Sequence, residues 1–372
     1  QLAHWNAAKH DGNDFSSHVG FYLVDKGLPE LERAVHAKLQ LTEIVRRWLG
    51  QSPLGIYLGS ILVITGILTG CLLLLAHTND VDGWPLVALG CLIALATSQL
   101  GSALTNRFAT MLVKPQPLPR MDYSRGLPGS MASLVAVPTL LTSIAGIEDL
   151  LEALEVRFLG NQDKHLHFAL LTDLRDAEAA VLAEDESLLN MALAGIAALN
   201  EKYRSAGNDR FFLLHRPRLW NPTDCVWMGR ERKRGKLADL NLLLRGQGRD
   251  RFSLIVGNQA ALSNIKYVIT LDTDTLLPRD SARQFVAAMA HPLNRPRFDE
   301  SRHRVCGGYS ILQPRMAASL SGANRSRYGQ LFGNEPGIDP YTRSVSDVYQ
   351  DLFGEGSFIG KGIYDVDAFE HA

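Results

Sequence analysis

The sequence has few cysteines and no excess of either charge, and both features exclude classes of protein. Only 4 of its 372 residues are cysteine, and they lack paired spacing and neighbouring histidines, which excludes a disulfide framework and a cysteine-based zinc site. The 38 Lys and Arg residues are balanced by 39 Asp and Glu residues, so we expect no nucleic-acid partner. A Gly-x-x-x-x-Gly-Lys-Ser/Thr motif is also absent, which argues against P-loop chemistry.

Charged side chains are missing altogether from two early stretches. No Asp, Glu, Lys or Arg occurs from Trp48 to Asn79, and Leu54–Ala76 is apolar and long enough to cross roughly 30 Å of hydrocarbon. A second uncharged run covers residues 83–106, although polar side chains dilute its second half. We predict two transmembrane helices within residues 51–110. A buried or interfacial helix remains the alternative for the second run.

Basic residues flank both runs but are absent between them. Lys38, Arg46 and Arg47 precede the first run, Arg107, Lys114, Arg120 and Arg125 follow the second, and the loop between them holds only Asp80 and Asp82. Since Lys and Arg resist translocation, both ends of the hairpin should be cytoplasmic. The prediction is a cytoplasmic amino-terminal segment at 1–50, a hairpin in the lipid bilayer, and a proline-rich linker at 111–126.

Residues 127–372 alternate between strand and helix patterns. Short β-branched or aliphatic runs at 133–141, 167–174, 211–216 and 267–271 predict strands. Amphipathic stretches at 146–160, 176–205, 228–246 and 281–290 predict helices. This alternation is typical of an α/β domain with a mainly parallel sheet covered on both faces, where ligands bind at the carboxyl ends of the strands.

An acidic pair lies at such a strand end. Asp272 and Asp274 follow the apolar run 267–271 directly, and carboxylate oxygens there suit Mg²⁺ or Mn²⁺ holding a nucleotide diphosphate. A solvated turn with an Asp that caps the next helix is the alternative, but Asp280 is better placed for that role. We therefore predict a metal site at Asp272 and Asp274.

Basic residues are dense just before the 228–246 helix pattern. Arg230, Arg232, Lys233, Arg234 and Lys236 fall within seven residues. Such a run could cradle a diphosphate, with Lys236 the best candidate, or could face anionic lipid.

Two further strand ends carry polar candidates. Thr139 and Asp173 end the first two predicted strands and could contact a base edge, and a structural role for each is about equally favoured. Trp220 and Trp227 could stack on sugar rings, although ordinary partial burial is commoner.

Six segments together resemble the glycosyltransferase region of bacterial cyclic β-1,2-glucan synthases. They read SSHVGFYLVDKGLPELE, LVAVPTLLTSIAGIEDLLEALEVRFLG, HFALLTDL, VWMGRERKRGKLADLN, YVITLDTDTLLPRDSA and LFGEGSFIGKGIYDVDAFE. The resemblance implies a GT-A-type domain, related to processive polysaccharide synthases, that uses UDP-glucose and a divalent cation and inverts the anomeric centre. It also implies a growing β-glucan acceptor and a multi-pass location in the bacterial cytoplasmic (inner) membrane.

The resemblance also assigns roles to individual positions. Asp272 and Asp274 match the family's metal and diphosphate pair, Asp173 with Thr139 matches its uracil-binding positions, and Lys236 matches the basic residue near the diphosphate. Glu355, Gly356 and residues 360–362 match the loop beside the sugar and acceptor. Inverting transfer also needs a general base. In the family this base follows the glycine-rich segment, so we expect it beyond Ala372 and expect the domain at 127–372 to be incomplete at its carboxyl end.

These observations predict a membrane-bound inverting glucosyltransferase that builds a β-1,2-glucan from UDP-glucose. A processive synthase of another polysaccharide from UDP-sugars is the nearest alternative. A membrane-tethered nucleotidyl or phosphoryl transferase, or a nucleotide-binding module without catalysis, is a more distant one. The sequence leaves the oligomeric state and the choice between Mg²⁺ and Mn²⁺ open.

Overall fold

The computed structural model describes residues 2–9, 15–40, 43–44, 47, 52–112, 117–204, 209–314, 327, 342–343, 346–347 and 360–370. The chain divides into two compact units, and each is described by itself. One comprises residues 1–29, 118–314 and 358–372, and the other comprises residues 30–117 and 315–357.

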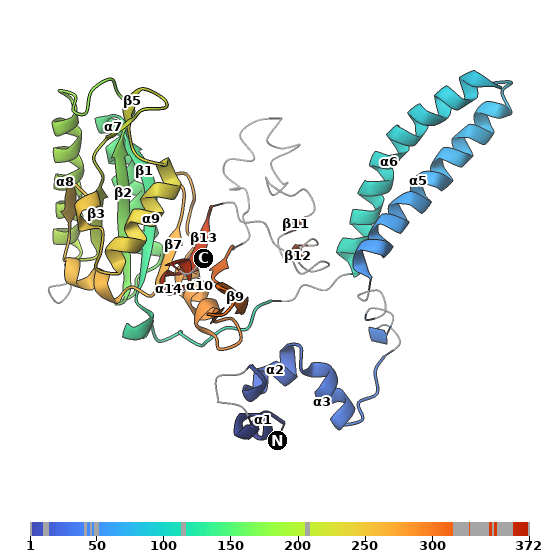
Figure 1. Cartoon of the computed structure of the whole chain (residues 1–372), viewed down its shortest axis with the longest axis horizontal. Helices are drawn as coiled ribbons and strands as arrows, with labels where there is room; N and C mark the ends of the chain where they lie inside the picture. The colour runs from blue at the N-terminus through green and yellow to red at the C-terminus, as the bar shows by residue number, and fades with distance from the viewer. Residues whose placement is uncertain are drawn as a thin grey trace. The chain divides into compact units, whose positions relative to one another are not determined.

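The first unit is built on a seven-stranded sheet in the order β10-β13-β7-β1-β2-β3-β6 (Figure 1). Its strands are β1 (Ser133–Leu141), β2 (Leu166–Leu174), β3 (Phe211–His215), β6 (Leu254–Val256), β7 (Tyr267–Thr270), β10 (Ile311–Leu312) and β13 (Gly362–Asp365). Strands β7, β1, β2 and β3 are mutually parallel, whereas β6 and β13 run antiparallel to their neighbours β3 and β7. The predicted mainly parallel α/β sheet is therefore confirmed.

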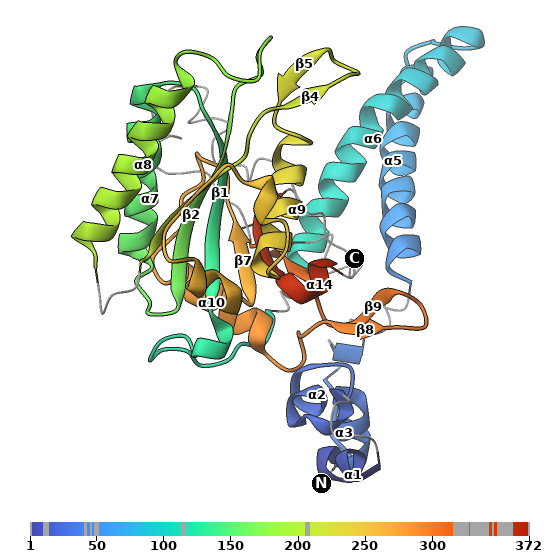
Figure 2. The ribbon, with the colours of Figure 1, turned by 60° about the vertical axis from the view of Figure 1, so that its left-hand side comes forward.

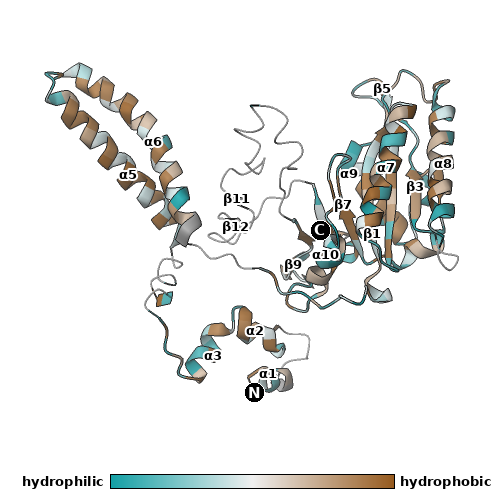
Figure 3. Ribbon diagram, turned by 180° about the vertical axis from the view of Figure 1, so that it is seen from behind, coloured by the Kyte–Doolittle hydropathy of each residue, from teal (hydrophilic) through white to brown (hydrophobic). Residues whose placement is uncertain are grey.

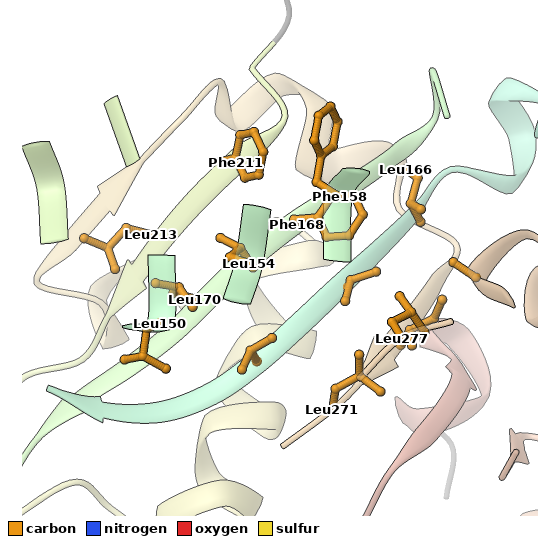
Figure 4. Packing of buried hydrophobic residues seen from close by; sticks show 14 of the residues in the cluster. Leu150, Leu154, Phe158, Leu166, Phe168, Leu170, Phe211, Leu213, Leu271 and Leu277 are labelled. Carbon is orange, nitrogen blue, oxygen red and sulfur yellow. The ribbon is translucent and has the colours of Figure 1, made fainter. Parts of the chain in front are cut away.

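Helices cover both faces of this sheet because its central strands are apolar on both sides. On β1, Val135 and Val137 pack with residues of α7 (Ile144–Gly160), α8 (Asp185–Lys202) and α10 (Ser281–Ala290). Figure 4 shows part of this core, with Leu150, Leu154 and Phe158 of α7 beside Phe168 and Leu170 of β2. The alternate residues Leu134 and Ala136 pack with residues of α9 (Arg232–Leu244) and with Val366 of α14 (Val366–Glu370) on the other face. Two apolar layers thus hold the sheet rigidly.

Shorter elements complete the first unit. They are α1 (Leu2–Lys9), η1 (Phe15–Ser17), α2 (Val19–Val24), η2 (Gly129–Met131), η3 (Arg249–Arg251), η4 (Gln259–Asn264), and the pairs β4 (Leu219–Asn221) with β5 (Val226–Met228) and β8 (Arg297–Asp299) with β9 (Arg304–Gly307). The amino-terminal segment contacts the β8–β9 region, since the Arg297 guanidinium lies 3.5 Å from the centre of the Phe15 ring.

The second unit contains a helical hairpin, α5 (Pro53–His77) and α6 (Trp84–Leu112). Figure 3 shows that both helices are hydrophobic along most of their length, and Pro53–His77 and Trp84–Ala109 are long and apolar enough to cross a membrane. The unit also holds α3 (Leu28–Ala34), apart from its first two residues, and the pair β11 (Thr342–Arg343) with β12 (Ser346–Asp347). The two predicted long helices are confirmed as helices.

One predicted helix begins later than expected. The pattern at 176–205 predicted a single helix, but α8 begins at Asp185, and the backbone of Ala177 pairs instead with Trp227 of β5. The Asp185 carboxylate accepts a hydrogen bond from the Leu182 backbone N–H and forms a buried ion pair with Arg218. These non-local contacts compete successfully with the local helix propensity of the preceding residues.

Candidate functional site

The carboxyl ends of β1, β2 and β7 bring the predicted polar residues to one edge of the sheet. Thr139 and Asp173 lie at the ends of β1 and β2, where Thr139 pairs in register with Thr172 and Leu140 with Asp173. Asp272 and Asp274 follow β7 directly. Helix α9, which Figure 2 shows beside β1 and β7, supplies Lys233 and Lys236. The topology thus assembles acidic and basic groups that are far apart in the sequence.

Asp272 is the most strongly engaged carboxylate at this edge. Lys233 Nζ lies 2.5 Å from its Oδ1, and Lys361 Nζ lies 3.1 Å from its Oδ2. The carboxylate is 37% exposed, so a ligand can reach it. Burial raises the pKa of Asp272, but the two lysines outweigh burial and hold the pKa below its usual value. Asp272 is therefore ionised at neutral pH.

Lys233 is itself tied to the glycine-rich segment. Its ammonium group donates to the carbonyl of Gly360 at 2.7 Å. Gly360 has a φ of 82°, a left-handed conformation that glycine adopts without steric cost. The segment that carries Lys361 is thereby held against the amino-terminal turn of α9.

Asp274 is the more open partner of the acidic pair. Its side chain is exposed, and its Oδ1 accepts a hydrogen bond from the Thr275 hydroxyl at 3.3 Å. No group of three or more His, Cys, Asp or Glu side chains that could hold a metal occurs within the described ranges. Mg²⁺, however, is commonly bound by only one or two carboxylates together with substrate phosphates and water. The donor chemistry of Asp272 and Asp274 fits such an ion.

Asp173 and Lys236 form a buried cluster beside the end of β1. Arg216 donates two hydrogen bonds of 2.9 Å to the Asp173 carboxylate, and Lys236 Nζ lies 3.3 Å from the same carboxylate. Lys236 also donates to the carbonyl of Thr139. Burial lowers the pKa of Lys236, and the charge of Asp173 works against this shift. The fully paired cluster fixes the end of β1 relative to β2 and α9.

The basic residues that lie beside the acidic pair do not include the one that the sequence favoured most. Lys236, the predicted diphosphate contact, lies in the Asp173 cluster, whereas Lys233 and Lys361 are the cations beside Asp272. The roles predicted for Thr139, Asp173 and Lys236 toward a nucleotide stay predictions. Glu355 and Gly356 lie outside the described residues, as does the general base expected beyond Ala372.

Two structural expectations near the site have clear outcomes. Asp280 occupies the position before α10, but its side chain makes no capping hydrogen bond and instead pairs with Arg283 at 3.1 Å. Trp220 and Trp227 face each other across the β4–β5 pair with ring centres 5.8 Å apart. Trp227 is partly buried, in agreement with the commoner expectation, whereas Trp220 is exposed.

Sequence reasoning overlooked two arginines of the site, although each left a signal. Arg216 follows β3 directly, at the same edge as the candidates on β1 and β2. Arg157 continues the spacing of the buried positions Leu150 and Leu154 on α7, so a charged residue occupies an otherwise apolar face. A charge at such a position indicates a specific buried partner.

No family model matches this chain. The chain is 44% identical over 282 residues, which is 76% of its length, to a curated protein described as "Cyclic beta-(1,2)-glucan synthase NdvB" from Rhizobium meliloti (strain 1021). The chain spans only 10% of the length of that relative. This similarity confirms the resemblance inferred from the sequence motifs, and the chain is homologous to one region of a cyclic β-glucan synthase.

Proposed function

We propose that this chain belongs to a membrane-bound glycosyltransferase that uses UDP-glucose to extend a β-1,2-glucan with inversion at the anomeric carbon. The observation that carries the proposal is the similarity to a glucan synthase, combined with an acidic pair at the ligand-binding edge of a mostly parallel sheet. In this proposal, the first unit is a glycosyltransferase domain of the GT-A type, and cyclisation belongs to the whole protein.

The diphosphate of the donor would bind between the acidic pair and the two flanking lysines. Asp272 and Asp274 would hold Mg²⁺ or Mn²⁺, which offsets negative charge on the departing diphosphate. Lys233 and Lys361 are partly exposed and already lie beside Asp272, so their ammonium groups can turn to phosphate oxygens. We favour these two lysines over Lys236 for direct phosphate contact because Lys236 is buried.

The uridine would lie beside the ends of β1 and β2. Thr139 and Asp173 would lie next to the uracil base. Arg216 and Lys236 would hold the Asp173 carboxylate in place beside the bound base. A buried carboxylate whose hydrogen bonds are all made keeps a fixed position and orientation. A fixed carboxylate favours binding of one base over binding of several different ones.

The inverting step requires a base that removes the proton from the attacking acceptor hydroxyl. Asp365 does not suit this role, since it pairs in register with Tyr267 at the amino end of β7, opposite the site, and it pairs with Lys266 at 3.0 Å. The base therefore stays an expectation for residues after Ala372, and Glu355 and Gly356 stay candidates for the sugar and acceptor loop.

The hairpin would anchor the enzyme in the bacterial inner membrane. Helices α5 and α6 have the length and hydrophobicity for this, and the flanking basic residues favour cytoplasmic ends. A cytoplasmic domain would meet UDP-glucose where nucleotide sugars are made.

The proposal is tested by calorimetric titration of UDP-glucose into the detergent-solubilised chain, with and without Mg²⁺. The double variant Asp272→Asn, Asp274→Asn should bind UDP-glucose about tenfold more weakly or worse in Mg²⁺, because the cation loses both carboxylate ligands. The matched control is Asp80→Asn, Asp82→Asn, which removes an acidic pair of the same spacing from the hairpin loop and should bind like the wild type. A folded wild type that binds no UDP-glucose, or prefers ATP, would contradict the proposal.

A further inference from the structure

Arg157 lies directly beneath the acidic loop that follows β7. Its guanidinium donates to the carbonyl oxygens of Asp272 at 3.2 Å and of Thr273 at 2.6 Å. Two further hydrogen bonds, of 2.9 and 3.1 Å, reach the carbonyl of Thr275. One side chain of α7 therefore binds three of the four peptide carbonyls from Asp272 to Thr275, although it is more than 100 positions away in the sequence.

The side chain is buried without a carboxylate of its own. Arg157 is only 2% exposed, and it forms no ion pair with any residue that the structure describes. Burial lowers the pKa of Arg157, and the nearby charge of Asp274 works against this shift. Within the described part of the chain, its Nη1 atom has no hydrogen-bond partner. Burying an arginine without a carboxylate partner is costly even when carbonyl groups accept its hydrogen bonds, so the charge itself requires an explanation.

A neutral side chain performs the same tethering four residues later, directly after the end of α7. The amide of Asn161 donates to the carbonyls of Leu277 and Pro278 at 3.3 and 3.1 Å, and its oxygen accepts from the Ala282 N–H at 3.0 Å. Tethering alone therefore does not demand an arginine. What distinguishes Arg157 is a positive charge placed under the segment that carries Asp272 and Asp274.

The hydrogen bonds of Arg157 also determine how the acidic loop faces. With its carbonyls turned inward to the guanidinium, the loop presents the Asp274 side chain to solvent and the Asp272 side chain to the two lysines. A buried charge acts through a medium of low dielectric constant, so it attracts an anion at the loop more strongly than a solvated charge would.

We propose that Arg157 is a positioning residue for the donor diphosphate: it orients the acidic loop outward and supplies a fixed positive charge beneath it. This inference rests on the proposed function, because it assigns to Arg157 the support of a nucleoside diphosphate sugar at the same site. Arg157 touches neither donor nor acceptor and is not a catalytic residue.

The test compares Arg157→Met and Arg157→Lys by UDP-glucose calorimetry in Mg²⁺, with thermal unfolding measured in parallel. Loss of a group that supports metal-binding side chains typically costs about 10- to 100-fold in metal affinity or activity, and we expect a loss of that order in UDP-glucose affinity for Arg157→Met in Mg²⁺. Arg157→Lys keeps the charge but loses the planar set of donors, so its affinity should lie between those of the wild type and Arg157→Met.

The matched control is Arg210→Met. Arg210 also donates to loop carbonyls, those of Asp163 (3.1 Å) and Lys164, but at the opposite end of the sheet, and burial lowers its pKa as well. Arg210→Met should lose thermal stability while the folded protein binds UDP-glucose like the wild type.

The outcomes separate the inference from the proposed function. If the wild type binds UDP-glucose and folded Arg157→Met and Arg157→Lys bind it equally well, Arg157 is structural only and the inference is overturned. If Arg157→Met does not fold, a wild-type affinity for Arg157→Lys overturns it, and a weakened affinity supports it. A wild type that does not bind UDP-glucose overturns the proposed function together with the inference.

Discussion

Two buried histidines of the sheet couple the stability of the domain to pH. His215 is 1% exposed at the end of β3, where its Nδ1 lies 2.9 Å from the Thr172 hydroxyl, and His167 is buried on β2. Burial lowers the pKa of each to about 4, from an ordinary value of 6.5. Both histidines are therefore neutral in the folded protein at neutral pH, and neither resembles a proton-transfer group of the site.

The sign of the effect on stability follows from these pKa values. Between pH 6.5 and pH 4, the unfolded chain binds a proton at His215 that the folded chain does not, so the free energy of unfolding falls as the pH is lowered through this window. We expect His215 to contribute about 2 kcal/mol of destabilisation between pH 7 and pH 5.

Urea unfolding of the chain in detergent, followed by tryptophan fluorescence at both pH values, measures this effect. His215→Gln should reduce the pH dependence by about 2 kcal/mol. Thr172→Val removes the hydrogen-bond partner but keeps the titrating ring, so it should lower stability at both pH values and retain the slope. An unchanged slope in His215→Gln would assign the pH dependence to other groups.

At the scale of elements, the hairpin is held by small and polar side chains along one seam. Thr69 and Thr97 share a hydrogen bond of 2.8 Å, and Tyr57 donates to Asn106 at 2.7 Å. Gly101 of α6 packs closely against α5, because a methyl group at this position would come within 2.6 Å of the Thr65 hydroxyl oxygen. Close approach through a small residue is a common way to join helices in a membrane.

Substituting alanine for two glycines of the hairpin separates packing from helix propensity. Gly101→Ala should destabilise the pairing of α5 and α6 by about 1–3 kcal/mol, because its methyl group overpacks the seam. Gly66→Ala meets no atom within 4 Å and should be neutral or stabilising through its higher helix propensity. Titration with sodium dodecyl sulfate in mixed micelles, followed by circular dichroism, compares the two. Equal behaviour of the variants would show that Gly101 does not lie at a tight contact.

At the scale of the whole molecule, the distribution of charge predicts one membrane topology. Basic residues flank the hairpin, whereas the charged residues of its loop are all acidic. The chain segments before and after the hairpin should therefore both lie on the cytoplasmic side. Exposed thiols provide the readout, since Cys225 and Cys306 lie in the first unit and are free.

Labelling of bacterial spheroplasts with a membrane-impermeant maleimide tests this topology. In a chain with Cys71→Ala and Cys91→Ala, the two remaining cysteines should react only after the membrane is permeabilised. In a chain whose four native cysteines are replaced, Asp82→Cys should react in intact spheroplasts. The reverse pattern would place the proposed glucosyltransferase domain away from cytoplasmic UDP-glucose.

Local sequence patterns were sufficient for the elements that carry their own signal. Strand β1 and helix α10 have the predicted boundaries, and α5 and α6 follow the two uncharged runs, because alternation and apolar length are properties of contiguous residues. The same patterns place Asp272 and Asp274 at a strand end. Strands β6, β10 and β13 were not predicted, because they are too short to show periodicity and depend on their partners in the sheet. Strand β7 is equally short, but its continuous apolar run predicted it.

The sequence by itself therefore determined the fold class, the two long apolar helices of the hairpin and the edge of the sheet where polar residues gather. Only the tertiary structure decided which residues meet there. The start and rotation of α9 place Lys233 beside Asp272 and bury Lys236 with Asp173, although the two lysines are three positions apart on one helix. The contact between Arg157 and the acidic loop depends on packing between distant segments. Which side chains come into contact depends on helix rotation and long-range packing, and patterns of contiguous residues do not encode either.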